Sequence, residues 1–304
     1  MKILITGGAG FIGSHLSETL SEDHDVFIYD NFVSGKEEFI KKGKTKIIRG
    51  DILDFDTLES AMEDINICYH LAADPDVKKS YYNPLNNFEI NCKGSLNVLE
   101  ACRKNNVSKL IFTSSSVVYG RANMPTPESA KIKPISNYGA GKASFENYLM
   151  SYSNLYDLEC LVVRYANIIG PRLTHGIIYD FYNKLRRDPG NLEILGNGKQ
   201  EKSYLHVSDC VEATIFASEN MDKKFEVYNV GSEDTISVNK IADIICEEMN
   251  LKDVKYRYTG GKKGWPGDVP KMLLSIEKIK EKGWEPKKNI EKAITDTLNY
   301  LEDQ

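Results

Sequence analysis

The sequence has no uninterrupted apolar stretch that approaches the roughly 20 residues needed for a membrane-spanning helix. It also has no surplus of basic residues, since 39 lysines and arginines stand against 44 aspartates and glutamates, giving a formal net charge of −5. Proteins that bind nucleic acids usually carry a basic face. We therefore expect neither a membrane nor a nucleic-acid partner, and the run at 41–44 is interpreted as a solvated loop.

Cysteine is scarce, with six residues in the chain, and none of them forms a C-x-x-C pair or a cluster typical of zinc sites. We expect no metal site. Most of the cysteines lie in apolar runs, where a free thiol packs as a small hydrophobic group. Unpaired cysteine indicates a reducing compartment, and the first residues, MKILITGG, resemble a strand and a turn rather than a signal peptide. We expect a cytoplasmic protein.

The sequence does contain an alternation of apolar strands and helical patterns. Strands are predicted at 2–6, 26–29, 46–48, 67–70, 110–113 and 160–163, and helices at 11–20, 53–62, 86–105 and 137–156. This alternation is typical of a doubly wound parallel α/β sheet. Glycine and proline become more frequent after Asn167, which predicts a smaller C-terminal α/β lobe. The expected domains are 1–166, with a returning segment near 203–232, and 167–304.

A glycine-rich turn joins the first predicted strand to the first predicted helix. Gly8, Gly10 and Gly13 match G-x-G-x-x-G, and Gly7, Gly10 and Gly13 match G-x-x-G-x-x-G. The turn needs glycine because its backbone must tighten and approach a pyrophosphate closely, while the helix start offers free N–H groups. The strand–turn–helix context supports the motif, which is weak by itself. The turn therefore predicts a dinucleotide site.

Acidic and small residues follow the next strands at positions that suit the same cofactor. Asp30 ends the second strand, where a carboxylate binds the adenosine ribose hydroxyls and repels the 2′-phosphate of NADP. Asp51 and Ile52 follow the third strand and suit the adenine, and the small residues of 71–73 follow the fourth. Lys36 is the only nearby cation, so we expect NAD rather than NADP. The alternative is a plain turn beside a solvated acid, which the agreement of these features disfavours.

Tyr138 and Lys142 are spaced i, i+4, so they share one face of the predicted helix 137–156. By itself this spacing is a common coincidence of a packed tyrosine and a solvated lysine. However, hydroxyl residues at 113–116, including Thr113 and Ser115, follow the fifth strand, and ligands of an open α/β sheet bind outside the carboxyl ends of its strands. A lysine ammonium and a positive nicotinamide would lower the pKa of Tyr138 and make it a general base.

With these motifs together, the chain resembles the extended short-chain dehydrogenases/reductases of the UDP-galactose 4-epimerase group. The residues that carry the resemblance run in order through the chain: 7–13, Asp30-Asn31, 50–52, 70–73, Asn91, 114–120, 138–142, 164–167, Gly170-Pro171 and 204–209. The match to this superfamily is specific, whereas the match to one substrate is not.

The resemblance implies NAD-dependent inversion of C4 of a UDP-hexose (UDP-glucose/UDP-galactose) through a transient 4-keto intermediate. Ser115 would assist proton transfer, Tyr138 would be the base and Lys142 would hold the nicotinamide ribose. The implied NAD-binding residues are Gly7, Gly10, Phe11, Ile12, Gly13, Asp30, Asn31, Ser34, Gly35, Asp51, Ile52, Leu71, Ala72, Ala73, Asn91, Thr113, Tyr138, Lys142 and Tyr165. The implied substrate-binding residues are Ser115, Tyr138, Asn167, Lys202 and Asp268, and the lobe 167–304 would bind the nucleotide sugar.

Three features of the sequence bear on the substrate. Positions 116–118 hold no carboxylate where dehydratases and decarboxylases of the superfamily carry an acid, which favours epimerisation over elimination. Lys202 and Trp265 stand where arginines are usual, and Arg172 and Lys262 are candidates to compensate. Met272 stands where a bulky tyrosine often limits the sugar pocket, which suggests that N-acetylated sugars also fit.

Two rival functions stay open from the sequence. One is an epimerase for UDP-N-acetylhexosamines, for uronic sugars or for another nucleotide base. The other is a non-catalytic NAD sensor, which would need the glycine turn but not Ser115, Tyr138 and Lys142. The resemblance also implies a homodimer packed through the predicted helices 86–105 and 137–156, and His70 and His206 are interpreted as structural residues.

Overall fold

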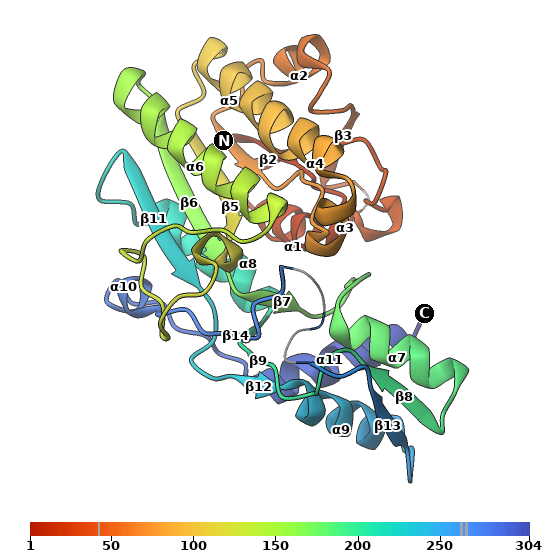
Figure 1. The fold of residues 1–304 in the computed structure, drawn as a ribbon. Coiled ribbons are helices and arrows are strands. Elements are labelled where there is room, and N and C mark those ends of the chain that lie inside the picture. Colours follow the sequence, from red (N-terminus) through yellow and green to blue (C-terminus); the bar gives the residue numbers. More distant parts are fainter. Residues whose placement is uncertain (42, 262–263, 265–266) are drawn as a thin grey trace. The chain divides into compact units, whose positions relative to one another are not determined.

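The computed structural model describes residues 1–41, 43–261, 264 and 267–304. The chain divides into two compact units (Figure 1). The first unit contains residues 1–121, 130–164 and 214–228, and the second contains 122–129, 165–213 and 229–304. Helix α8 (Val207–Glu219) has residues in both units. No helix among these residues is long and apolar enough to cross a lipid bilayer.

A seven-stranded sheet forms the centre of the first unit, in the order β11-β6-β5-β4-β1-β2-β3. The strands are β1 (Lys2–Thr6), β2 (Asp25–Asp30), β3 (Thr45–Arg49), β4 (Ile67–His70), β5 (Lys109–Ser115), β6 (Glu159–Tyr165) and β11 (Phe225–Val230). β1 pairs in parallel with β2 and β4, β2 with β3, and β4 with β5. The predicted doubly wound parallel sheet is confirmed.

The helices of the first unit follow the strands in alternation. They are α1 (Phe11–Leu20), α2 (Phe55–Ala61), α3 (Val77–Tyr82), α4 (Pro84–Phe88), α5 (Ser95–Lys104) and α6 (Asn137–Leu155), with short helical turns η1 (Glu37–Phe39) and η3 (Ser116–Tyr119). Figure 1 shows α2, α5 and α6 in one layer over the sheet. Their apolar faces and one face of the sheet share a core that includes Leu4, Leu58, Val98, Phe112 and Leu149. Ile3 and Ile5 are buried as well, so β1 is covered on both faces, as a parallel sheet requires.

The predicted helix 86–105 is the clearest local difference from expectation. The chain becomes helical at α4, widens into a π-helical segment η2 (Glu89–Gly94), and continues as α5. Asn91 lies in the wide segment, and its side chain accepts a hydrogen bond from the Asp74 amide at 2.9 Å and donates to the Asp74 carbonyl at 3.0 Å. Apolar periodicity carries no signal of these bonds. Such π-segments occur often at functional sites.

The second unit is built from short strands and amphipathic helices. Its strands are β7 (Asn167–Ile169), β8 (Asn191–Ile194), β9 (Glu201–Lys202), β10 (Tyr204–His206), β12 (Ile236–Ser237), β13 (Lys255–Tyr258) and β14 (Lys271–Met272). Its other helices are α7 (Ile177–Arg187), α9 (Val238–Glu248), α10 (Glu277–Lys280) and α11 (Ile290–Glu302). The strands form the parallel pairs β7–β10 and β8–β13 and the three-stranded sheet β12-β9-β14. The predicted C-terminal α/β lobe is thus present, although two- and three-residue strands such as β7, β12 and β14 escaped prediction.

Candidate active site

The glycine turn connects β1 to α1 in a conformation that only glycine fits. Gly7 has φ 72°, and a Cβ atom there would lie 2.6 Å from the Ala72 amide nitrogen. A Cβ atom at Gly13 would lie 2.2 Å from the Gly7 carbonyl oxygen. At Gly10, by contrast, a Cβ atom would meet only that same oxygen, at 3.2 Å, among the described residues. The turn therefore packs tightly against β4 and leaves its Gly10 face open at the start of α1, where Phe11 and Ile12 follow.

Asp30 is a buried carboxylate at the carboxyl end of β2. It accepts hydrogen bonds from the Ala9 amide at 3.0 Å and the Phe32 amide at 2.8 Å. A Cβ atom at Gly35 would lie 2.9 Å from the Asp30 Oδ1 atom, so glycine keeps the space beside the carboxylate clear. The nearby cation Lys36 pairs with Glu38 at 3.0 Å. These features fit a ribose with free hydroxyls.

The other residues predicted for NAD lie at the same edge of the sheet, because β4, β1, β2 and β3 are parallel neighbours. The Asn31 amide donates to the Asp51 carboxylate at 2.8 Å, and Ile52 is buried beside them. The backbone of Leu71 and Ala72 is held by Thr6, through its carbonyl at 3.0 Å and its hydroxyl at 3.4 Å. Ser34 and Ala73 lie in the loops after β2 and β4.

Lys142 is buried on α6, with 3% of its surface exposed, and its ammonium donates to the Thr113 carbonyl at 2.8 Å. The same atom lies 5.7 Å from the centre of the Tyr138 ring. Burial lowers the pKa of Lys142 to about 7, against the opposing effect of Glu146. The structure therefore brings Tyr138, Lys142 and the end of β5 together, as predicted.

The pKa of Tyr138 is raised, first by burial and second by the charge of Asp74. From the sequence we expected the Lys142 ammonium and a positive nicotinamide to lower it. For the protein without cofactor that expectation is wrong. Burial disfavours the phenolate of Tyr138, and it also disfavours the charged form of Lys142 that would have stabilised the phenolate.

Ser115 ends β5, and its hydroxyl caps the following turn η3 by accepting a hydrogen bond from the Val117 amide at 3.4 Å. It is partly buried, and it comes two residues after Thr113 on the same strand. The hydroxyl group is thus at the sheet edge where the Lys142 ammonium is anchored.

Asp74 was missed from the sequence, where a catalytic acid was sought only at 116–118. It follows Ala73 at the carboxyl end of β4, is buried, and is close enough to Tyr138 to raise its pKa. One carboxylate oxygen accepts from Asn86 at 3.3 Å and lies 3.8 Å from the Lys79 ammonium. An acid directly after the small residues 71–73 was the available signal.

The residues predicted for the substrate in the second unit form a local group of their own. Lys202 on β9 forms an ion pair with the buried Asp268 at 2.8 Å, and Met272 on β14 stands opposite Lys202 in the strand register. The Asn167 amide donates to the Ser203 carbonyl at 2.9 Å. Tyr165, which was predicted for NAD rather than for the substrate, is the last residue of β6 and is buried. Trp265 and Lys262 lie outside the described residues.

The two histidines singled out by the sequence are held by hydroxyl groups. His70 lies 2.7 Å from the Thr6 hydroxyl and 2.9 Å from the Ser95 hydroxyl, and burial lowers its pKa to about 3. His206 contacts the Ser208 hydroxyl at 2.7 Å. These contacts support the interpretation of both as structural residues.

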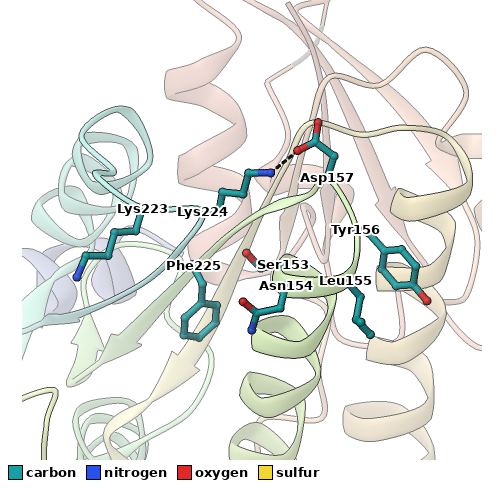
Figure 2. A pocket seen from close by; sticks show the side chains of 8 residues that line it. All are labelled: Ser153, Asn154, Leu155, Tyr156, Asp157, Lys223, Lys224 and Phe225. Carbon is teal, nitrogen blue, oxygen red and sulfur yellow. Dashed lines mark hydrogen bonds and ion pairs between the residues drawn. The ribbon is translucent and has the colours of Figure 1, made fainter.

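A surface pocket of about 610 Å³ lies elsewhere on the first unit (Figure 2). It is lined by 153–157, at the end of α6 and before β6, and by 223–225, at the start of β11. These are the amino ends of the strands, opposite to the edge that holds the predicted site. The exposed ion pair Asp157–Lys224 lies in this pocket, and no catalytic group gathers there.

The comparisons with known proteins identify the family. The sequence pattern of the NAD dependent epimerase/dehydratase family matches residues 3–231. The chain belongs to this family. The family is also that of the extended short-chain dehydrogenases/reductases to which the sequence motifs pointed, so the resemblance is confirmed.

Solved members of this family are similar over the full chain. A crystal structure of UDP-galactose 4-epimerase is 41% identical, covers 100% of this chain and 99% of its own, and superposes with a TM-score of 0.91. UDP-glucose 4-epimerase from Thermotoga maritima, solved with UDP-glucose, is 35% identical with 100% and 99% coverage and a TM-score of 0.92. UDP-N-acetylglucosamine 4-epimerase from Methanobrevibacter ruminantium M1, solved with UDP-N-acetylmuramic acid, is 32% identical with 100% and 98% coverage and a TM-score of 0.91.

The burial of Lys142 predicts how stability depends on pH. The folded protein gives up the Lys142 proton at about pH 7, and the unfolded chain does so near 10.4. Between these values the unfolded chain binds more protons, so the stability of the wild type rises with pH, by up to about 1.4 kcal/mol per unit. Lys142→Met removes this dependence. We expect the variant to be more stable than the wild type at neutral pH and the gap to narrow towards about pH 10.

Urea unfolding of the cofactor-free proteins across this pH range measures the gap. Lys240→Met, which changes an exposed lysine of the second unit, is the control and should run parallel to the wild type. A constant gap between wild type and Lys142→Met would show that Lys142 titrates normally and would contradict the prediction.

Proposed function

We propose that this protein is an NAD-dependent 4-epimerase that interconverts UDP-glucose and UDP-galactose. The observation that carries the proposal is the cluster of Tyr138, Lys142 and the end of β5 at the sheet edge that also holds the glycine turn. Its similarity to UDP-galactose and UDP-glucose 4-epimerases extends over the whole chain. An NAD sensor would need the glycine turn but not this cluster.

The residues at the sheet edge fit NAD. The open face at Gly10 and the start of α1 suit a pyrophosphate, and Asp30 suits the two ribose hydroxyls, with Gly35 leaving room. Asn31, Asp51 and Ile52 would surround the adenine, and 71–73 would line the path to the nicotinamide. We assign NAD binding to the domain 1–166 with the segment 203–232, and the nucleotide sugar to 167–304.

When bound, NAD supplies the acceptor and donor of hydride at C4 of the sugar and a positive charge beside Tyr138. The raised pKa of Tyr138 means that it keeps its proton at neutral pH in the free protein. A positive charge nearby favours the phenolate, so the tyrosine becomes a base for the sugar 4-hydroxyl once the site is filled. Ser115 would pass this proton, and Lys142 would hold the nicotinamide ribose while Thr113 anchors its ammonium.

Simple epimerisation is favoured over elimination because no acid follows Ser115 at 116–118. Asp74 is the one carboxylate near Tyr138 that the described residues add, and Asn86 and Lys79 engage it. With no acid at 116–118 to protonate a leaving hydroxyl group, the 4-keto sugar would receive its hydride back rather than lose that group.

For the nucleotide, we propose that Lys202 and Asn167 bind the diphosphate and Asp268 the ribose. Lys202 and Asp268 already form an ion pair. The diphosphate would therefore share the Lys202 ammonium with the Asp268 carboxylate, which partly compensates its charge. Lysine binds phosphate as a point charge rather than through a fork.

A second candidate function is the 4-epimerisation of UDP-N-acetylhexosamines. Met272 replaces the bulky tyrosine, and methionine is flexible enough to make room for an acetamido group. A UDP-N-acetylglucosamine 4-epimerase is among the similar solved structures.

We further propose a homodimer and a cytoplasmic location. Apolar side chains on α4 and α6 are exposed, including Leu85 at 78% and Leu155 at 68%. Exposed apolar side chains grouped on neighbouring helices suit an interface between two copies. All six cysteines are free thiols, which suits a reducing compartment.

Turnover tests the main proposal. Purified protein without added NAD is offered UDP-galactose and UDP-N-acetylgalactosamine separately, and the C4 epimers are measured. We expect turnover, and we expect Tyr138→Phe to lose about 10²- to 10⁴-fold of it because the proton acceptor is gone. Tyr148→Phe, on the exposed side of the same helix, should keep wild-type turnover. Absence of turnover on both substrates, even with NAD added, would contradict the proposal and favour a non-catalytic NAD sensor.

Met272→Tyr tests the second candidate. A larger side chain should exclude the acetamido group, so the ratio of N-acetylated to plain substrate turnover should fall about tenfold. Lys271→Tyr places the same side chain on the opposite face of β14 and should leave the ratio unchanged. An unchanged ratio in Met272→Tyr would remove Met272 from the sugar pocket.

Light scattering tests the homodimer. A charge at an apolar interface costs several kcal/mol, so Leu85→Glu and Leu155→Glu should shift the protein from dimer to monomer. Tyr258→Glu, at an exposed aromatic residue of the second unit, is the control. A dimer that survives both interface changes would place the contact elsewhere.

A further inference from the structure

Tyr138, Lys142 and Glu146 follow one another at intervals of four residues on α6, so they share one face of the helix. The proposed function uses only the first two. Glu146 is buried, with 3% of its surface exposed. A buried glutamate is rare unless it is paired, so its contacts require an explanation.

Glu146 makes an ion pair with Arg164 on β6, which is also buried. The Arg164 Nε atom lies 3.1 Å from one carboxylate oxygen, and the Nη2 atom lies 2.6 Å from the other. This is a bidentate arrangement, the strongest that a carboxylate and a guanidinium form. The Ser114 hydroxyl donates to the same carboxylate at 2.5 Å. Glu146 therefore connects α6 to the ends of two neighbouring strands.

Arg164 extends the network to the turn after β5. Its Nη1 atom donates to the Tyr119 hydroxyl at 2.7 Å, and its guanidinium lies 4.9 Å from the centre of the Tyr119 ring. Tyr119 is the last residue of η3, and Ser115 caps the first turn of the same segment. The ion pair thus holds Ser114 and Tyr119, which flank Ser115 on both sides.

The same network reaches Lys142 from two directions. The Lys142 ammonium bonds to the Thr113 carbonyl, and the next residue, Ser114, bonds to Glu146. The negative charge of Glu146 also favours the ammonium form of Lys142 and so raises its pKa, against the lowering caused by burial. His70, another titratable neighbour of Lys142, is uncharged above about pH 3. Glu146 therefore acts on both the position and the charge of Lys142.

Stability alone does not account for such a pair. Taking two charges out of water costs about as much as their attraction returns, and apolar residues of similar volume are often as stable. We propose that Glu146 and Arg164 are a positioning pair that holds Ser115 and Lys142 in place for proton transfer at Tyr138. The inference rests on the proposed function and deepens it, because it names residues that act through the catalytic groups without touching the substrate.

Turnover kinetics of three variants test the positioning role. Glu146→Gln keeps the shape and removes the charge, Ser114→Ala removes one contact, and the double variant Glu146→Leu with Arg164→Met removes the pair without leaving an unpaired buried charge. We expect kcat to fall about 10- to 100-fold in Glu146→Gln and in the double variant, because small displacements of catalytic groups cost this much. Ser114→Ala should show a smaller loss, and KM should change less than threefold in all of them.

Two control variants match the changes. Asp157→Asn removes one negative charge from the exposed pair in the pocket of Figure 2, and Tyr69→Phe removes the buried hydrogen bond from Tyr69 to Ser218. Both should keep wild-type kcat. If the double variant folds and has wild-type kcat, the pair does not position the catalytic groups and the proposal is overturned.

A measurement without turnover separates this proposal from the proposed function. The pKa of Lys142 is measured by NMR in cofactor-free protein labelled at the lysine Cε atoms, with Lys142→Met to assign the signal. Glu146→Gln should lower this pKa below that of the wild type, whereas Asp157→Asn should not. An unchanged pKa would overturn the action of Glu146 on Lys142. If the wild type turned over no UDP-sugar, the proposed function would be contradicted. The titration would still test whether Glu146 acts on the pKa of Lys142.

Discussion

Parallel pairing of the strands is the constraint on which the first unit depends. Because neighbouring strands run in the same direction, their carboxyl ends meet at one edge of the sheet. The glycine turn after β1, Asp30 at the end of β2 and the hydroxyl residues at the end of β5 are more than a hundred residues apart in the chain at their extremes. Hydrogen bonding of the strand backbones sets their positions, and the bond from the Ala9 amide to the Asp30 carboxylate adds a direct contact between the first two.

Burial of the titratable groups at this edge then determines their protonation. The buried groups behind it are paired through hydroxyls and carbonyls, as in the chain Thr6–His70–Ser95 and the bond from Lys142 to Thr113. Burial disfavours charge on each of these groups. It holds His70 neutral, weakens the ammonium of Lys142 and keeps the proton on Tyr138. In the proposed function, Tyr138 would act as a base only once a positive charge enters the site, which would couple proton transfer to occupation of the cofactor site.

The fold and the centre of the site were predictable because both have a strong local signal. Apolar runs with β-branched residues marked the strands, and the i, i+4 spacing of Tyr138 and Lys142 marked the helix face. Asp74 and the pair Glu146–Arg164 were not predictable in the same way. Their importance comes from contacts between elements far apart in the sequence, and no single spacing reports them. The π-helical segment around Asn91 was not predictable for the same reason, since the hydrogen bonds between Asn91 and Asp74 that accompany it are tertiary contacts.

The sugar is harder to predict than the reaction for a related physical reason. Hydride and proton transfer at C4 need the same groups whatever the rest of the sugar carries, and the residues proposed for them lie on or directly after helices and strands of the first unit. Lys202, Asp268 and Met272 instead belong to two-residue strands and loops of the second unit, where a single side chain changes the space available. One extra or missing methylene group in a pocket alters binding by only about 1–3 kcal/mol. A difference of this size can follow from Met272 alone, so full-length similarity to epimerases of different UDP-sugars is compatible with one catalytic centre.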